Sequence, residues 1–287
     1  MAVTANTIVT TDLAPAISVD FTSKITKNIV ELQNVLGISE LIPLAAGTDV
    51  KFYKTSQLNT PAQVAEGETI PLTEIKRELV GTKTLTLQKY RKVTTAEAIQ
   101  KAGRDIAINK TDERLLNGVQ SAIKTAFYTA LATGTGTATG TNLQKALAAL
   151  WAKLQNYYVD EDVNPIYFIN PSDVADYLGT ASITMQDTFG FTYIENFLGL
   201  GTAVVSPSVT ANNPVATAKE NLCGAYAPVS GDVGQSFGLT ADTTGLVGMT
   251  HTVKSDNASI ETLLMAGVMF YPEFADGIFK ATISTGA

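Results

Sequence analysis

The chain contains 287 residues, of which 45% are hydrophobic and 16% are charged, and its formal net charge is −7. A protein that grips nucleic acid by neutralising phosphates needs a basic face, so this charge argues against that class. A typical charged share is ~25%, and a surface this poor in charge suits a subunit that buries its outside against copies of itself. Cys223 is the only cysteine, which excludes an intramolecular disulfide and a Cys-x-x-Cys metal or redox motif.

Neither a signal peptide nor a membrane span is indicated. The first residues lack a basic start and an apolar run, and no stretch approaches the ~18 apolar residues of a spanning helix. We therefore expect a soluble protein made in the cytosol, with about two domains' worth of chain at ~150 residues each.

The charge is unevenly spread along the chain. Residues 48–92 contain eight basic and five acidic side chains, whereas the rest of the chain is strongly acidic. One interpretation is an ordinary solvated hairpin. The other is a basic arm that lies on an acidic neighbour, and charge alone leaves both open.

The N-terminal part begins with residues 1–28, which show no sustained period and predict an extended or disordered arm. Apolar residues at helical spacing then predict a short helix that stops at Gly37. They are Ile25, Ile29, Leu32 and Leu36. Further along, the segment 81–93 alternates polar residues with Leu85 and Leu87, which predicts one continuous strand.

A long amphipathic helix is predicted over residues 104–131, because apolar side chains recur at intervals of three and four along it. The residues expected to form the core face of this helix are Leu115, Val119, Ile123, Phe127 and Leu131. The Gly- and Thr-rich tract TGTGTATGT, residues 133–141, ends the helix and is interpreted as a loop.

A second helix is predicted to follow Asn142, which is a favourable N-cap residue. We interpret Trp151 on its apolar face as a core residue, together with Leu143, Leu147, Leu150 and Leu154. A short buried strand is predicted over residues 166–169, followed by a helix that opens at Pro171. The remaining sequence consists of β-like runs between Gly- and Thr-rich turns, and these elements together predict an α+β fold.

One catalytic pattern matches the sequence. GQSFG, residues 234–238, fits the G-x-S-x-G nucleophile elbow around Ser236, and Asp242 and His251 follow in the order of an α/β-hydrolase triad. The elbow requires a helix directly after the serine, and the following residues show no helical period. We therefore do not expect a triad, and His251 is the only histidine that could act as its base. A serine hydrolase remains the alternative from a different functional class.

Two further patterns do not support a binding site. The Gly- and Thr-rich tract lacks the third glycine of G-x-G-x-x-G and the lysine of a phosphate-binding loop. The acidic run 160–162 lacks the spacing of a calcium-binding loop and is interpreted as a solvated turn. We therefore expect no catalytic residue, no cofactor and no metal.

The order of these elements resembles the major capsid proteins of tailed bacteriophages with the Hong Kong 97-type fold. Members of that family commonly carry an A-E-G-x-x-I/K-P stretch in a long hairpin. The matching residues here are Ala65, Glu66, Gly67, Ile70 and Pro71. The stretch NPIYFINPSDVADYLG is similar to the family's strand that ends in Asn-Pro before a short helix. The final stretch MAGVMFYPEFADGIFKATI looks like the usual terminal strand, so the resemblance covers nearly the whole chain.

The resemblance implies five parts. They are an N-terminal arm with a short helix (1–46), an extended β-hairpin loop (47–92), a peripheral domain with the spine helix (93–140), an axial domain (141–255) and a return to the peripheral domain (256–287). Each leg of the hairpin would hold about 22 residues and could extend roughly 70 Å at ~3.3 Å per residue. A globule of this chain length has a radius of gyration of only ~19 Å, so the hairpin must project onto a neighbour.

The resemblance also implies a structural protein, not an enzyme, that self-assembles into an icosahedral phage head enclosing double-stranded DNA. The expected partners are copies of itself as hexamers and pentamers, a separate scaffolding protein, and portal and head-completion proteins. The expected location is the virion, after synthesis in the host cytoplasm, with no membrane and no sequence-specific DNA binding. A scaffolding extension is not expected, because the arm begins at Met1.

Inter-subunit contacts are expected on the hairpin. The residues concerned are Glu66, Glu68, Ile70, Leu72, Ile75, Lys76 and Arg77. The first alternative is an encapsulin, a bacterial protein compartment that shares this fold. Encapsulins typically begin with a cargo-facing helix, whereas the N-terminus here reads as an irregular arm.

Overall fold

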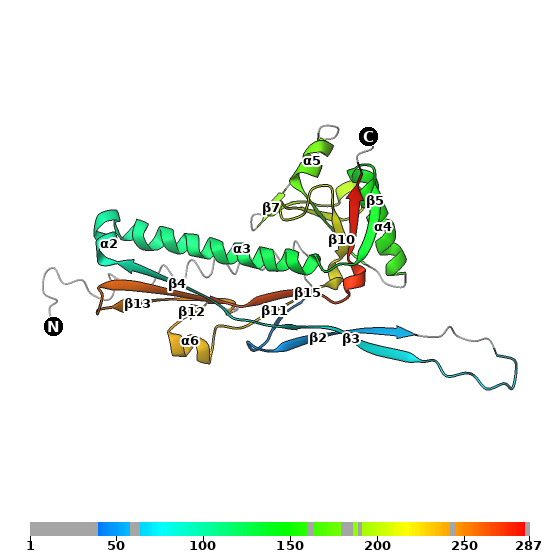
Figure 1. The fold of residues 1–287 in the computed structure, drawn as a ribbon, viewed down its shortest axis with the longest axis horizontal. Helices are drawn as coiled ribbons and strands as arrows, with labels where there is room; N and C mark the ends of the chain where they lie inside the picture. The colour runs from blue at the N-terminus through cyan, green and yellow to red at the C-terminus, as the bar shows by residue number, and fades with distance from the viewer. Residues whose placement is uncertain are drawn as a thin grey trace.

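The computed structural model describes residues 40–57, 64–159, 163–178, 186–188, 191–241 and 245–284. The short helix predicted between residues 25 and 36 and the acidic run 160–162 lie outside these residues. The described part of the chain is elongated. One long helix lies along a layer of strands, a compact unit stands at one end, and a β-hairpin extends beyond that end (Figure 1).

Two sheets follow one another beneath the long helix (Figure 1). The first is antiparallel, in the order β12 (Thr240–Ala241), β13 (Val247–Lys254), β14 (Ser259–Ala266) and β4 (Gln88–Thr95). The second has the order β1 (Glu40–Pro43), β11 (Leu222–Tyr226) and β15 (Val268–Pro272), with β1 parallel to β11. A short helix, α6 (Asp232–Phe237), lies on the side of this layer away from the long helix (Figure 1).

The long helix α3 (Thr111–Leu131) covers this layer with its apolar face. Of the expected face, Val119, Ile123, Phe127 and Leu131 are buried, whereas Leu115 is half-buried and its neighbour Leu116 is buried instead. Helical backbone begins at Arg104, as predicted, although the turn Asp105–Lys110 is π-helical. A separate short helix, α2 (Ala96–Ala102), precedes it and ends at Gly103. Thr95 caps α2, accepting a hydrogen bond from the Ala98 amide at 3.3 Å.

The compact unit is a seven-stranded mixed sheet with two helices. Its strand order is β5 (Gly136–Gly140), β16 (Phe279–Ile283), β10 (Val215–Ala218), β6 (Pro165–Ile169), β9 (Thr202–Val205), β8 (Phe191–Ile194) and β7 (Gln186–Thr188). The helices are α4 (Leu143–Tyr157) and α5 (Pro171–Leu178). Single turns of 3-10 helix are Phe197–Gly199, Lys219–Asn221 and Ala275–Gly277. These elements confirm the predicted α+β fold, including the strand and helix on either side of Asn170.

Helix α4 starts where the sequence predicts, because the Asn142 side chain accepts a hydrogen bond from the Lys145 amide at 2.9 Å. Its buried face contains Leu147, Leu150 and Leu154. The interpretation of Trp151 as a core residue is wrong, since this side chain is 41% exposed. The three leucines already define the stripe that meets the sheet, and Trp151 lies at its margin.

The interpretation of the Gly- and Thr-rich tract as a loop is also wrong, because β5 pairs with β16 in a parallel ladder. The glycines of this strand allow close packing. A Cβ atom on Gly136 would lie 2.3 Å from the Phe279 ring, and one on Gly140 would lie 2.4 Å from the Ala146 backbone in α4. Small residues are therefore required where the strand runs against a ring and a helix.

The strand predicted over residues 81–93 is two strands in different sheets. β3 (Ile75–Thr84) pairs with β2 (Asp49–Gln57), whereas β4 pairs with β14. Between them, the backbone of buried Leu85 bonds to the other leg, with the Gly47 amide donating to its carbonyl at 2.8 Å. The two-stranded hairpin therefore ends at Thr84, well before residue 92.

The chain passes from one sheet to another at residues that differ from the expected domain limits. β11, β12 and β13 fall within the expected axial range 141–255, yet they belong to the layer beneath α3. β16 falls within the expected peripheral range 256–287, yet it lies in the seven-stranded sheet. Both differences arise because the chain crosses between the two parts after β10 and again after β15, and such long-range pairings leave no local pattern.

Candidate assembly interface

The base of the β2–β3 hairpin is fixed by contacts with β15. The ring centroids of Phe52 and Tyr271 are 5.0 Å apart, and Lys83 Nζ donates a hydrogen bond to the Phe270 carbonyl oxygen at 2.9 Å. Burial at this position lowers the pKa of Lys83. The base of the hairpin is therefore half-buried against its own subunit.

The rest of the hairpin projects away from the body (Figure 1), and its apolar side chains are exposed. Ile70, Leu72 and Ile75 are all largely in solvent, and Leu72 is 91% exposed. Neighbouring exposed apolar groups of this kind mark interaction surfaces in proteins. The structure thus separates a half-buried base, which contacts β15, from a projecting part whose described side chains are exposed.

A tight turn shapes the A-E-G-E stretch near the tip. The Glu68 amide donates to the Ala65 carbonyl oxygen at 3.1 Å, and the Ala65 amide donates to Glu68 Oε2 at 3.3 Å. Gly67 has φ of +88°, which a residue with a Cβ atom adopts only with strain. The glycine of the A-E-G stretch is therefore explained by the backbone conformation of this turn.

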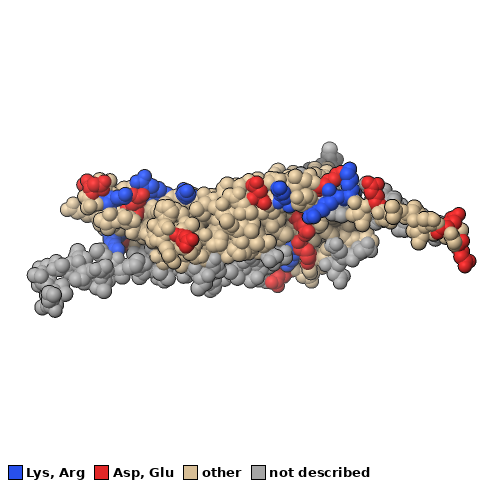
Figure 2. All heavy atoms as spheres, turned by 90° about the horizontal axis from the view of Figure 1, so that it is seen from below, with Lys and Arg blue, Asp and Glu red and all other residues tan. Residues whose placement is uncertain are grey.

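The hairpin carries both charge signs in equal number. Residues 49–84 include five basic and five acidic side chains. The three acidic residues Glu66, Glu68 and Glu74 lie in the tip segment, whereas the basic residues lie on the two strands. Figure 2 shows acidic side chains at the far end of the hairpin and basic ones nearer the body.

The hypothesis of a basic arm is therefore wrong for the hairpin. The basic excess of residues 48–92 comes from Lys89, Arg91 and Lys92 of β4, and the last two are engaged within the subunit. Arg91 pairs with Glu261, and Lys92 Nζ lies 2.6 Å from Asp112 Oδ1.

The seven residues expected at inter-subunit contacts all lie on one exposed segment of the hairpin. Lys76 Nζ pairs with Glu78 on its own strand at 2.7 Å, and this ion pair raises the pKa of Lys76. The Arg77 guanidinium carbon lies 4.1 Å from the centroid of the Tyr53 ring, a cation–π geometry that orders the side chain on the hairpin. Their role in contacts stays a prediction.

The face seen in Figure 2 has charged side chains gathered toward its two ends, with a mostly uncharged middle. Helix α6 lies on this face, and its Phe237 is more than half exposed. The free-energy cost of removing water from such a face on binding another protein is small, because few charged groups would be buried.

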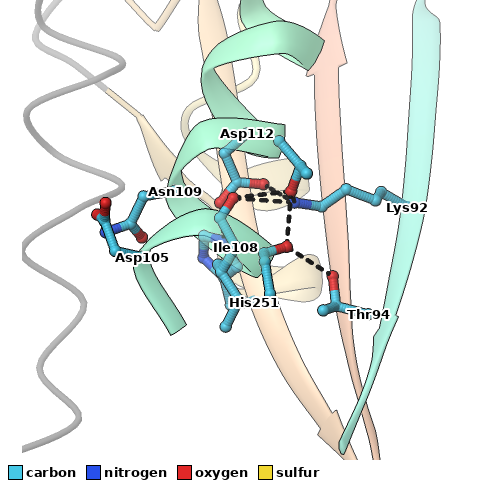
Figure 3. A network of polar contacts seen from close by, with 9 residues as sticks. Lys92, Thr94, Asp105, Ile108, Asn109, Asp112 and His251 are labelled. Carbon is cyan, nitrogen blue, oxygen red and sulfur yellow. Dashed lines mark hydrogen bonds and ion pairs between the residues drawn. The ribbon is translucent and has the colours of Figure 1, made fainter. Parts of the chain in front are cut away.

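The structure does not bring the candidate triad together. Ser236 lies inside α6 rather than on a strand-to-helix turn, and Asp242 is outside the described residues. His251 points toward α3, where its Nε2 lies 2.8 Å from Asp112 Oδ2 (Figure 3). On the opposite face of the same strand, Gly248 faces the chain that flanks α6. Ser236 and His251 are therefore separated by the sheet.

Instead, His251 belongs to a buried ionic cluster that sequence reasoning missed. We call Asp112, Lys92 and His251 the Asp112 cluster. The Asp112 side chain is fully buried, and the two partners are largely buried beside it (Figure 3). Burial opposes the ionisation of Asp112, but the hydrogen bonds from His251 and Lys92 outweigh it, so the pKa of Asp112 lies below its usual value. The cluster joins α3 to β4 and β13, and each of its members already has a structural partner.

Metal and membrane sites are not indicated in the parts of the chain that the structure describes. There, His, Cys, Asp and Glu side chains form no group of three or more placed to hold a metal ion. Among the same residues, none of the helices is long and apolar enough to cross a membrane.

These parts together make the Hong Kong 97-type capsid fold, as the sequence predicts. The capsid of an empty GTA particle matches with a TM-score of 0.61 and 12% sequence identity, covering 99% of this chain and 95% of its own. The structure titled Gordonia phage Cozz matches with a TM-score of 0.55 and 12% identity, covering 89% of this chain and 87% of its own.

The same fold is shared by a protein compartment. The holo-SrpI encapsulin complex from Synechococcus elongatus matches with a TM-score of 0.50 and 11% identity, covering 85% of this chain and 84% of its own. No family model matches the chain, and no curated protein sequence matches it. The likeness is therefore one of fold, at sequence identities too low to carry over individual residues.

Proposed function

We propose that this chain is the shell-forming subunit of a tailed-phage head, a structural protein that assembles around double-stranded DNA. The observation that carries the proposal is the hairpin. Its base is half-buried against its own subunit, whereas Ile70, Leu72 and Ile75 stand in solvent on the projecting part. Apolar groups grouped on an extended arm are expected to be covered by a partner, and the fold that bears this arm is that of capsid subunits.

The mechanism of assembly is geometric. Each hairpin lies across a neighbouring copy, and the same contact repeats around every hexamer and pentamer. Fully burying one large aliphatic side chain contributes about 1.5–3 kcal/mol, while an exposed ion pair adds only ~0–1 kcal/mol. The apolar residues of the hairpin therefore supply most of each contact, and Glu66, Glu68, Lys76 and Arg77 fix its orientation.

The proposed partners are copies of this chain, a separate scaffolding protein, and portal and head-completion proteins. The proposed location is the virion, after synthesis in the host cytoplasm. A net charge of −7 suits an inner surface that does not grip the packaged DNA.

Deleting residues 65–74 tests the proposal. The deletion keeps every β2–β3 pair, since Gln57 pairs with Ile75 at the end of the ladder. The truncated chain should show an unchanged circular dichroism spectrum and thermal melt, because residues 65–74 are all exposed. Sedimentation and negative-stain microscopy should show closed shells for the unaltered chain and none for the truncated one.

A matched control removes an exposed apolar side chain elsewhere. Val253 is as exposed as Ile70 but lies in β13, at the other end of the molecule. Val253→Ser should leave assembly intact if the hairpin contact is specific. Normal shells from the truncated chain would make the segment a passive loop, and an unfolded product would place it in the subunit's own core.

The contents of the shells separate a phage head from an encapsulin-type compartment. Particles recovered from infected or producing cells should contain nuclease-protected DNA if the chain forms a phage head. Enclosed protein cargo without DNA would favour the compartment and overturn the phage assignment while leaving the shell-forming role intact.

A further inference from the structure

A cavity of about 240 Å³ opens where the hairpin leaves the body of the subunit. Its walls come from the base of the hairpin, the end of α3 and the segment that leads from β15 toward the compact unit (Figure 1). Most of the side chains that line it are apolar or aromatic, and the largest of them are Phe52, Tyr53, Tyr271, Pro272 and Phe274. The cavity is therefore suited to receive apolar side chains.

The ladder of the hairpin is irregular beside this cavity. Phe52 pairs with Gly81, whereas the next residue, Tyr53, pairs with Leu79, so β3 has one extra residue at this point. A β-bulge of this kind adds local twist and re-aims side chains, and bulges are over-represented next to active sites. Neighbouring residues of a regular strand point to opposite faces, yet both rings line the one cavity. The bulge thus coincides with the place where two adjacent aromatic side chains share a pocket.

Lys83 contributes a half-buried cation to the same cavity. Its Nζ donates to the Phe270 carbonyl oxygen at 2.9 Å, and burial lowers its pKa. Glu273 and Asp276 also line the cavity, but within the described parts of the chain neither forms an ion pair with Lys83. A carboxylate that entered beside Lys83 would favour its charged form. The cavity therefore combines apolar walls with a cation that can accept an acidic partner.

The tip of the hairpin, residues 64–74, has a composition complementary to this cavity. Ile70 and Leu72 are exposed apolar side chains on either side of Pro71. Glu68 lies two residues before Ile70, and Glu74 lies two residues after Leu72. A short apolar segment with a carboxylate at each end therefore stands in solvent, while an apolar cavity with a cation lies open at the base of the same hairpin.

We propose that the hairpin tip of one subunit binds in the cavity at the hairpin base of a second copy, with Ile70 and Leu72 against the aromatic walls and a tip carboxylate beside Lys83. The proposal rests on the proposed function and deepens it, because it names the surface that receives the hairpin. Tip and cavity are different surfaces of one chain, so the contact is heterologous and repeats around a ring. Each bound tip also packs against the base of the next hairpin.

Disulfide cross-linking between copies tests this contact. Cys223→Ser removes the only native thiol, Thr73→Cys places one on the tip without altering Ile70 or Leu72, and Ala275→Cys places one on the cavity wall. Oxidised capsomers and shells should give a ladder of covalent oligomers up to complete rings, whereas the dilute unassembled chain should give none. A disulfide requires Cα atoms about 4.4–6.8 Å apart, so the ladder reports a tip that is seated in the cavity.

The matched control pairs Thr73→Cys with Val253→Cys. Val253 is exposed but lies in β13, at the other end of the molecule. This pair should give no ladder. Assembled particles without cross-links in the test pair would assign the cavity to a different partner and overturn the contact, and so would equal cross-linking in the control. A failure of the unaltered chain to form shells would overturn the proposed function instead.

Exchange of charges tests the role of Lys83 without cysteines. Lys83→Glu should lower the shell yield about tenfold or more, because like charges would then meet at the contact. Adding Glu68→Lys and Glu74→Lys to the same chain should restore most of the yield, with the melts of both variants recorded beside it. A merely structural Lys83 would leave the combined variant as poor as Lys83→Glu, and that result, or an unchanged yield for Lys83→Glu, would overturn the assigned carboxylate contact.

Discussion

Phe127 is the side chain whose truncation should damage this fold most. It is 1% exposed on α3, and its ring centroid lies 5.4 Å from that of Phe168 and 5.5 Å from that of Phe270. Phe168 belongs to β6 of the compact unit, whereas Phe270 belongs to β15 beneath α3. One aromatic ring therefore joins the two parts of the molecule.

The magnitude follows from the cavity that truncation leaves. Replacing a buried phenylalanine by alanine typically costs 3–5 kcal/mol, so we expect about that loss for Phe127→Ala. The contacts with two further rings favour the upper part of this range, because each aromatic pair contributes ~0.5–1.5 kcal/mol beyond its buried area. A typical domain has only ~5–15 kcal/mol of stability, so the variant should be close to unfolding.

Urea unfolding of the unassembled chain, followed by circular dichroism, measures this loss. If the two parts unfold in separate transitions, Phe127→Ala should move both, because the ring contacts both sheets. Thr125→Ala, an exposed site on the same helix, is the control and should change stability by no more than about 0.5 kcal/mol. A loss below about 1 kcal/mol for Phe127→Ala, or a shift in one transition only, would refute the reasoning.

Four further outcomes are expected. Reversing Lys76 and Arg77 to Glu should leave the melt unchanged and lower the shell yield most at low ionic strength, as a salt series followed by light scattering would show. Because the pKa of Asp112 is held below its ordinary 3.8, its ion pairs stabilise the fold above that pH and lose this effect as the pH falls further. The difference in unfolding free energy between the unaltered chain and Asp112→Asn should therefore shrink below about pH 4. Asn142→Ala should cost about 1 kcal/mol in a thermal melt by removing the cap of α4. A serine-reactive probe should leave Ser236 unlabelled, because the sheet separates it from His251; stoichiometric labelling in intact protein would contradict that geometry.

The sequence predicts those elements whose pattern is local. The apolar period of α3 and the Asn142 cap of α4 mark real helices, and residues 166–169 form a real strand. Three errors share one cause, because each depends on a partner that is distant in sequence. β5 is a strand only because β16 lies beside it, and the strand over residues 81–93 divides because its two halves find different neighbours. Trp151 lies next to the apolar stripe of α4, but the helical period does not tell how far the sheet covers the helix surface on either side of that stripe.

The interface is likewise only partly readable from the sequence. The polar, motif-bearing segment around Gly67 predicts an exposed hairpin tip, and the structure has one. The charge count over residues 48–92 is misleading, since it adds the cations of β4 to a hairpin that is neutral by itself. The Asp112 cluster leaves no sequence signal at all, because it forms only when three strands take one register under α3.

The exposure of the hairpin tip also affects the balance between single subunits and assembled ones under the proposed function. Burying Ile70, Leu72 and Ile75 on a neighbour would contribute about 1.5–3 kcal/mol each. Association alone costs an estimated 4–15 kcal/mol in lost translational and rotational freedom. One hairpin contact is thus close to balance and does not hold a pair of subunits firmly. In a closed ring, the hairpin of each subunit would contact one neighbour, and the hairpin of the other neighbour would contact that subunit in turn. The subunit that closes the ring would therefore form two hairpin contacts but lose its translational and rotational freedom only once. Under the proposed function, contacts made by the exposed tip would therefore favour complete capsomers over isolated dimers.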